Sequence, residues 1–256
     1  MNMNLFRLFS VAAAVLLLAA CTQELKTART TGHGEVPMRE GSDASLSYEY
    51  DMEYVTGGVP QDVMDRINNT LIASLVTYDA DESGTDVAAA CKAWAKDLED
   101  GYKADTQDAG NEFDERQDWM FNWEYGMDGA FTTACKARKL QTYTSSSNEY
   151  TGGAHGLYGE TNLVFDMTTG ETVTEADLFT DELQEGISDL LFDKVTEYLE
   201  EIELPDALFG TPAPNGNFSV SENGVTWYFN PYEVAPYVAG VVEAGFSWDE
   251  LKPYLK

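Results

Sequence analysis

The sequence predicts an α+β fold in which helices pack on one face of a mainly antiparallel sheet. Segments whose apolar residues alternate with period two are mixed with segments whose apolar residues recur about every 3.6 positions. The two kinds of segment do not follow a βαβ rhythm, and the glycine patterns of Rossmann folds and P-loops do not occur. We expect two sequential α+β halves, residues 43–142 and 143–256.

The first half is expected to run strand, helix, helix, strands. Residues 45–55 alternate between apolar or aromatic side chains and Ser, Glu or Asp, which predicts an amphipathic strand. The apolar spacing changes after a proline, which predicts a helix over about residues 61–76. A second helix is expected over about 85–102. Alternation returns at residue 118, and strand pairing is expected over 118–143.

The second half begins with extended chain and ends with a helix. Residues 157–173 read as a strand, a Thr-Thr-Gly turn and a further extended piece, followed by a capped helical turn at 174–179. The longest helix is expected over 182–203. An Asn-Gly pair between apolar-rich strands predicts a hairpin over 218–230. A Ser and a Glu three residues apart form a capping box for a short helix over 247–255.

The amino-terminal residues predict export and lipid anchoring. Residues 1–20 combine a short basic region with an apolar run that is too short to span a bilayer, which is typical of a secretory signal. The sequence Leu-Ala-Ala-Cys that ends at Cys21 resembles the lipobox of bacterial lipoproteins, which implies that acyl chains on this cysteine anchor the protein. Residues 21–42 are polar and lack periodicity, so they are expected to form a tether. The expected location is the cell envelope, on a bacterial membrane, facing the periplasm or the exterior.

The charge of the chain limits its partners. It contains 45 Asp and Glu residues but only 15 Lys and Arg residues, for a net charge of −30. Such a surface repels nucleic acid and anionic headgroups, so we expect no nucleic-acid binding and membrane contact only through the anchor. A cationic partner would be attracted, although the acidity can also serve solubility alone.

Two cysteines remain once Cys21 is assigned to lipidation. Cys91 and Cys135 are expected to form a disulfide, because paired cysteines are common outside the cytoplasm. Two buried free thiols are the alternative.

One acidic segment resembles the opening of a calcium loop. Residues 79–86, DADESGTD, match its first ligand positions, but the twelfth position, where a bidentate Glu is required, is Ala90. We therefore favour an acidic turn between helices, and expect neither a metal nor a cofactor.

The segment YTGGAHG, residues 150–156, is the first candidate binding element. Gly152 and Gly153 permit positive φ and would let backbone N–H groups approach a partner, and Gly156 follows the imidazole. His155 could fasten the loop to a strand, bind a ligand or transfer a proton, and the residues favour the structural role. A histidine-based metal site is not expected, because no second histidine lies nearby. Tyr150 completes the candidate loop.

The segment NPYEVAPYVAG, residues 230–240, is the second candidate. Two prolines fix φ and remove hydrogen-bond donors, which predicts a rigid connection and not a central strand. Tyr232, Glu233 and Tyr237 lie between or after them. Tyrosines on a stiff loop can form a recognition surface or pack into the sheet, and the sequence leaves both interpretations open.

These motifs resemble an uncharacterised domain family of bacterial envelopes. YTGGAHG, VFDMTTGETVTEADLF and YFNPYEVAPYVAG occur in the order seen in the extracellular domain of the lysozyme-sensing anti-sigma factor RsiV and in the region before the catalytic domain of PdaC-type peptidoglycan deacetylases. The resemblance covers about residues 143–256. The sigma-binding segment, the spanning helix and the deacetylase domain of those proteins have no counterpart here, so their activities are not implied.

The function expected from residues and resemblance is a lipid-anchored, non-enzymatic binding module of the cell envelope. Its partner would be peptidoglycan or a cationic wall-directed protein of the lysozyme type. The candidate binding residues are Tyr150, Gly152, Gly153, His155, Gly156, Tyr232, Glu233 and Tyr237. The alternatives are a hydrolase or deacetylase-type enzyme acting on wall glycan, with His155 and a carboxylate as acid and base, and a purely structural lipoprotein.

Overall fold

The computed structural model describes residues 24–76, 85–107 and 120–256, and over these residues the fold is α+β as predicted. A five-stranded sheet has the order β1-β2-β3-β4-β5, and a smaller sheet has the order β6-β7-β8. Every strand pair is antiparallel except β2 with β3. The strands are β1 (Lys26–Pro37), β2 (Ser45–Gly57), β3 (Trp123–Cys135), β4 (Leu140–Tyr150), β5 (Leu157–Asp166), β6 (Phe218–Val220), β7 (Gly224–Phe229) and β8 (Val242–Ser247). The helices are α1 (Gln61–Leu71), α3 (Val87–Thr106), α5 (Glu175–Leu178), α6 (Glu182–Glu201) and α7 (Trp248–Leu251), with a π-helical turn, η1, at Ile72–Val76.

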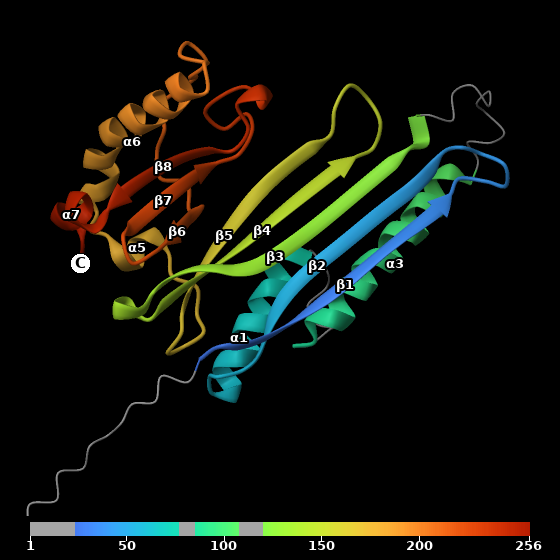
Figure 1. The fold of residues 1–256 in the computed structure, drawn as a ribbon, viewed down its shortest axis with the longest axis horizontal. Helices are drawn as coiled ribbons and strands as arrows, with labels where there is room; N and C mark the ends of the chain where they lie inside the picture. The colour runs from blue at the N-terminus through green and yellow to red at the C-terminus, as the bar shows by residue number, and fades with distance from the viewer. Residues whose placement is uncertain (1–23, 77–84, 108–119) are drawn as a thin grey trace, which may run out of the picture.

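The two faces of the large sheet are covered by different cores. Side chains alternate along β5, so that Phe165 belongs to the core of α1 and α3 while Val164 belongs to the core of α6 and the small sheet. Figure 1 shows α1 and α3 alongside β1 and β2, and the small sheet with α6 beside the lower ends of β4 and β5.

Strand β1 occupies a segment that the sequence assigned to the tether. Residues 26–37 pair with β2 along its whole length. The glycines that suggested a linker make room for aromatic rings: a Cβ atom at Gly32 would lie 2.4 Å from the Tyr50 ring, and one at Gly34 would lie 2.4 Å from the Tyr48 ring. The tyrosine rings pack over the space that the missing glycine side chains leave on the strand. Because residues 26–37 pair with β2, the folded chain includes most of the predicted tether.

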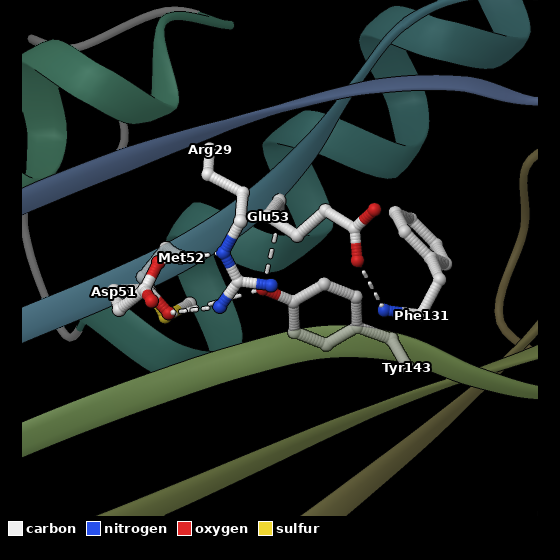
Figure 2. A network of polar contacts seen from close by, with 6 residues as sticks. All are labelled: Arg29, Asp51, Met52, Glu53, Phe131 and Tyr143. Atoms are coloured by element: carbon white, nitrogen blue, oxygen red, sulfur yellow. Dashed lines mark hydrogen bonds and ion pairs between the residues drawn. The ribbon is translucent and has the colours of Figure 1, made fainter.

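A polar network joins the strands where the parallel pairing of β2 with β3 ends (Figure 2). The Glu53 carboxylate accepts the Phe131 backbone N–H at 2.9 Å, and the buried Tyr143 hydroxyl donates to the Glu53 carbonyl oxygen at 2.9 Å. Arg29 on β1 forms an ion pair with Asp51, with Nε 2.7 Å from Oδ1. The register of β3 shifts just after Phe131, so side chains supply the hydrogen bonds that strand pairing no longer provides.

The second half agrees with the predicted helix and hairpin, but it also contains a strand that the sequence analysis missed. Helix α6 runs from Glu182 to Glu201, close to the predicted range, and Leu190 on it is exposed. The Asn-Gly pair does lie in a hairpin, between β6 and β7. The additional strand β8 buries Val242, Ala244 and Phe246 against the core around Trp227. Its small residues gave only a weak alternation signal.

The boundary expected between residues 142 and 143 falls inside β4. That strand pairs with β3 on one side and β5 on the other, so the large sheet is continuous across the expected boundary. The chain therefore does not divide at this point into halves with separate sheets.

The expected disulfide is not formed. Cys91 and Cys135 are both free and buried. Cys91 lies on α3 in the core beneath one face of the large sheet, whereas Cys135 ends β3 in the core of the small sheet. Because successive side chains of β3 and β4 point to opposite faces of the sheet, the two cores lie on opposite faces and the thiols do not meet.

Some predictions concern residues outside the described ranges. The secretory signal and Cys21 precede residue 24, and most of the calcium-like segment 79–86 falls between 76 and 85. Asp86 itself is the N-cap of α3, where its carboxylate accepts the Ala89 backbone N–H at 3.0 Å. Within the described ranges, no helix is both long enough and apolar enough to cross a bilayer.

Candidate functional site

The loop between β4 and β5 is closed by contacts of its own residues. Gly152 and Gly153 have φ values of 97° and 99°, a region that glycine adopts without strain. The Tyr150 hydroxyl donates to the Gly153 carbonyl at 3.1 Å. A Cβ atom at Gly156 would lie 2.6 Å from the Glu149 carbonyl oxygen, so this position requires glycine for close approach to β4. The loop thereby holds His155 at the exposed end of the sheet.

The second candidate segment leaves β7 and folds into a tight turn. The Glu233 backbone N–H donates to the Asn230 carbonyl and the Tyr232 N–H to the Ala235 carbonyl, both at 3.0 Å. Tyr232 has a φ of 72°, which is uncommon for a residue with a side chain and is enforced by this turn. A 3-10 turn then carries Tyr237. The segment is the rigid connection that its prolines predict.

Two asparagine side chains attach this region to the outer edge of β5. The Asn230 amide accepts the Glu160 backbone N–H at 2.7 Å and donates to the Glu160 carbonyl at 3.0 Å. Asn217 does the same one step further along, accepting the Asn162 N–H at 2.8 Å and donating to the Glu160 carbonyl at 2.9 Å. The amides therefore replace a neighbouring strand, which protects the sheet edge. They also place the segment after Asn230 beside the loop before β5.

The two segments meet in a group of four rings, His155, Tyr158, Tyr232 and Tyr237, which we call the aromatic cluster. The His155 and Tyr237 rings are stacked, with centroids 4.4 Å apart and planes inclined by 27°. The Tyr158 ring meets Tyr237 edge-on at 5.2 Å, and Tyr232 lies 5.9 Å from Tyr237 on a tilted plane. Rings from segments about 80 positions apart thus form one surface.

Hydrogen bonds fix the orientation of the imidazole. Nδ1 lies 2.9 Å from the Gly156 carbonyl oxygen, which can only accept, so Nδ1 carries the proton of the neutral ring. Nε2 is then an acceptor, and the Tyr232 hydroxyl lies 3.5 Å from it. The Glu233 carboxylate instead accepts from the Asn215 side chain at 2.8 Å. Neither of the two hydrogen bonds to the imidazole comes from a carboxylate of the kind that orients a catalytic base.

The aromatic cluster and its neighbours are open to solvent. Tyr232 is 51% exposed and Tyr158 39%, while the flanking apolar residues Val238 and Leu157 are 73% and 53% exposed. Burial of such residues against a partner would stabilise a complex by roughly 25 cal/mol for each Å² of apolar surface. The arrangement suits contact with another molecule better than it suits internal packing.

Of the predicted site residues, His155, Tyr232 and Tyr237 come together. Tyr150, Gly152, Gly153 and Gly156 shape the loop without forming part of the cluster surface, and Glu233 supports the opposite segment. Sequence reasoning missed Tyr158 and Asn230. Asn230 is the first residue of the second candidate segment, but its side chain bonds to the backbone of a strand 70 positions earlier, which local sequence does not reveal. Within the described ranges, no group of three or more His, Cys, Asp or Glu side chains could hold a metal ion.

Comparison with known proteins supports the fold. The family model described as a protein of unknown function, DUF3298, matches residues 176–249, which include α6, the small sheet and the segment that carries Tyr232 and Tyr237. The chain thus contains a match to a domain whose function is unknown. No curated protein matches the chain.

Two solved structures resemble nearly the whole chain. A DUF3298 family member from Bacteroides fragilis superposes with a TM-score of 0.80 at 22% identity, covering 92% of this chain and 95% of that one. A DUF3298 family protein from Pseudomonas aeruginosa superposes with a TM-score of 0.66 at 16% identity, covering 92% and 96% respectively. At these identities the likeness establishes a shared fold.

Proposed function

We propose that this protein is a lipid-anchored, non-enzymatic binding module of the bacterial cell envelope, and that the aromatic cluster is its docking surface. The observation that carries the proposal is the stacking of His155 on Tyr237 at 4.4 Å, beside exposed Tyr158 and Tyr232. Aromatic side chains with restricted motion provide contact area at a small cost in conformational entropy. The glycine loop and the two prolines restrict that motion.

A cationic, wall-directed protein of the lysozyme type is the preferred partner. The net charge of −30 favours encounter with a basic protein, and the resemblance to the RsiV extracellular domain supports the same class. Peptidoglycan is the other partner consistent with an envelope location, since sugar rings can also lie on exposed aromatic faces. Binding to insoluble peptidoglycan, compared in parallel, separates the two.

The test is calorimetric titration of the chain with hen lysozyme at low and at physiological salt. We expect binding that weakens as salt rises, because exposed charges are screened. Tyr232→Asn removes a ring but tolerates positive φ, and should weaken binding about tenfold, the size of a moderate interface hot spot. Phe192→Ser on α6, where the ring is 43% exposed, is the matched control and should bind as the parent does. Absence of lysozyme binding at low salt removes this partner.

An enzyme acting on wall glycan is the competing class. It would need His155 to exchange a proton with substrate, yet Nε2 faces the Tyr232 hydroxyl and Nδ1 faces a carbonyl. Turnover of purified muropeptides that disappears in a folded His155→Ala variant would replace the binding proposal with an enzymatic one.

A further inference from the structure

A hollow of about 540 Å³ lies against the outer edge of β5. Asn162, Leu163 and Val164 line it in succession, and successive side chains of a strand point to opposite faces of the sheet. Side chains from the layers on both faces complete the lining, among them Thr70 of α1, Ser74 of η1, Phe179, Leu183 of α6 and Phe218 of β6. Because only the edge of a sheet can be reached from both of its faces, the hollow lies at that edge.

The backbone groups along this edge pair with neighbouring segments. In an antiparallel strand the N–H and C=O of one residue point to the same side, and those of Asn162, Val164 and Asp166 point away from β4. The Val164 carbonyl accepts the Val173 N–H at 2.7 Å, and the Asp166 N–H donates to the Glu171 carbonyl at 3.0 Å. The segment that follows β5 therefore occupies the edge on one side of the hollow.

On the other side of the hollow, the Asn217 carboxamide occupies the edge. Its oxygen accepts the Asn162 N–H at 2.8 Å, and its NH2 group donates to the Glu160 carbonyl at 2.9 Å. Between this amide and the segment that follows β5, neither the Asn162 carbonyl nor the Val164 N–H has a hydrogen-bond partner among the described residues. These two groups, which we call the open step, flank Leu163 in the wall of the hollow.

The open step requires a hydrogen-bonding partner. Asn162 and Val164 are only 4% and 2% exposed, and a buried backbone group without a hydrogen bond is costly. The open step offers one acceptor and one donor, in the same arrangement that the Glu160 carbonyl and the Asn162 N–H present to Asn217 one step earlier. A primary carboxamide carries an oxygen and an NH2 group side by side, and so matches both. The protein itself thus shows which chemical group fits this edge.

We propose that this hollow binds molecules that carry a primary carboxamide, with the amide hydrogen-bonded to the open step. A peptide strand could not lie along the edge instead, because Asn217 fills the step before the open one and residues 171–173 fill the step after it. The inference goes beyond the proposed function and does not depend on it, because the hollow and the aromatic cluster share no residue.

The remaining lining selects a neutral group as the body of such a molecule. The buried side chains of Phe179, Leu183 and Phe218 provide apolar surface. Glu175 and Asp181 are the charged residues among the described residues that line the hollow, so an anionic ligand is repelled. A volume of about 540 Å³ lies within the range of small-molecule sites, and leaves room for a ring beside the carboxamide.

Benzamide is the probe, because its ring suits the apolar surface and its carboxamide suits the open step. The measurement is amide NMR of the protein with ¹⁵N-labelled valine. We expect the Val164 N–H signal to move and saturate as benzamide is added, with a Kd on the order of 1 mM. Benzoate and N,N-dimethylbenzamide both lack the donor, so each should bind about tenfold more weakly, as for the loss of one hydrogen bond.

A pair of variants tests whether benzamide lies in the hollow. Ser74→Trp introduces a large ring at the exposed rim of the hollow and should abolish benzamide binding. Ala73→Trp introduces the same ring at the neighbouring exposed position, which does not line the hollow, and should bind as the parent does. Thermal unfolding verifies that both variants are folded, and the three ligands compared on the parent decide the question if one variant is not.

Three results would overturn the proposal. The first is a Val164 signal that does not move saturably with benzamide. The second is binding of benzoate or N,N-dimethylbenzamide as tight as that of benzamide, which would mean that the hollow accepts rings without recognising the carboxamide. The third is equal binding by Ser74→Trp and Ala73→Trp, which would place benzamide elsewhere. Absence of lysozyme binding, by contrast, removes only the partner proposed for the aromatic cluster.

Discussion

Glycine has three different roles in this chain. At Gly32 and Gly34 in β1, tyrosine rings occupy the space that a side chain would need. Gly152 and Gly153 adopt positive φ, and Gly156 lies close to a backbone carbonyl oxygen. The sequence indicated the roles in the loop, since the glycines are adjacent to one another and surround a histidine. It did not indicate those in β1, because the covering tyrosines lie on another strand. A residue whose role depends on a distant side chain cannot be interpreted from its neighbours alone.

The cysteines provide a prediction at the scale of single residues. Burial raises the pKa of the Cys91 thiol to about 12, so at pH 8 only about one molecule in ten thousand carries the reactive thiolate. Cys135 is 3% exposed. In a chain produced without residues 1–21, we expect thiol reagents to react slowly in the folded state and to detect both cysteines after denaturation.

The measurement is a colorimetric thiol titration with and without guanidinium chloride, after purification without reductant. Detection of no thiol in the denatured chain would mean that a disulfide forms, contrary to the free cysteines seen here. Single Cys91→Ala and Cys135→Ala variants assign each signal.

At the scale of secondary structure, local signals predicted the elements that have local causes. Both capping boxes form, at Thr174 with Asp177 and at Ser247 with Glu250. Helices α1, α3 and α6 follow from apolar spacing. By contrast, β1 and β8 are strands because they pair along their length with β2 and β7, although β1 is rich in Thr and Gly and β8 contains Ala and Gly. The hydrogen bonds of the Asn230 side chain to β5 likewise cannot be predicted from local sequence patterns.

The carboxyl-terminal capping box predicts a pH-dependent contribution to stability. The Glu250 carboxylate accepts hydrogen bonds from the Ser247 hydroxyl and backbone N–H, and these bonds lower the pKa of Glu250. A carboxyl whose folded pKa is lowered stabilises the fold above its unfolded pKa of about 4.3, and this contribution is lost as pH falls through the folded pKa. We expect Ser247→Ala to lower the free energy of unfolding by about 1 kcal/mol at pH 7, with a smaller effect in acid.

Urea unfolding at pH 7 and at pH 3 measures both quantities. Asp249→Asn, one residue before Glu250 and without a hydrogen bond to the cap, is the control and should change stability little. An effect of Ser247→Ala that is as large at pH 3 as at pH 7 would show that the hydroxyl acts without the ionised carboxylate.

At the scale of the whole molecule, the sequence predicted the fold class but not the way the layers assemble. His155 and Tyr237 were candidates because each lies in a stiff, unusual segment, and they stack. The position of their neighbour Tyr158 depends on the pairing of β5 with β4. The arrangement of the layers follows from two cores on opposite faces of one sheet, a property of strand pairing over long distances.

The excess of negative charge predicts how salt changes global stability. With 45 acidic and 15 basic residues, carboxylates repel one another more than ion pairs attract, and the ion pairs of the described residues are mostly exposed and worth little each. Salt shortens the screening length from about 30 Å at 0.01 M to about 8 Å at 0.15 M. Because folding brings the carboxylates together, screening should favour the folded state.

We therefore expect the urea midpoint to rise as sodium chloride increases over this range, with a gain in unfolding free energy on the order of 1 kcal/mol, the size of one close charge pair in water. Urea is required because guanidinium is itself a salt. The variant D189N/D193N/E200Q carries three fewer negative charges and should gain less from salt. A midpoint that falls with salt would mean that attractive ion pairs dominate the folded state. An unchanged urea m-value would confirm that salt alters stability and not the surface exposed on unfolding.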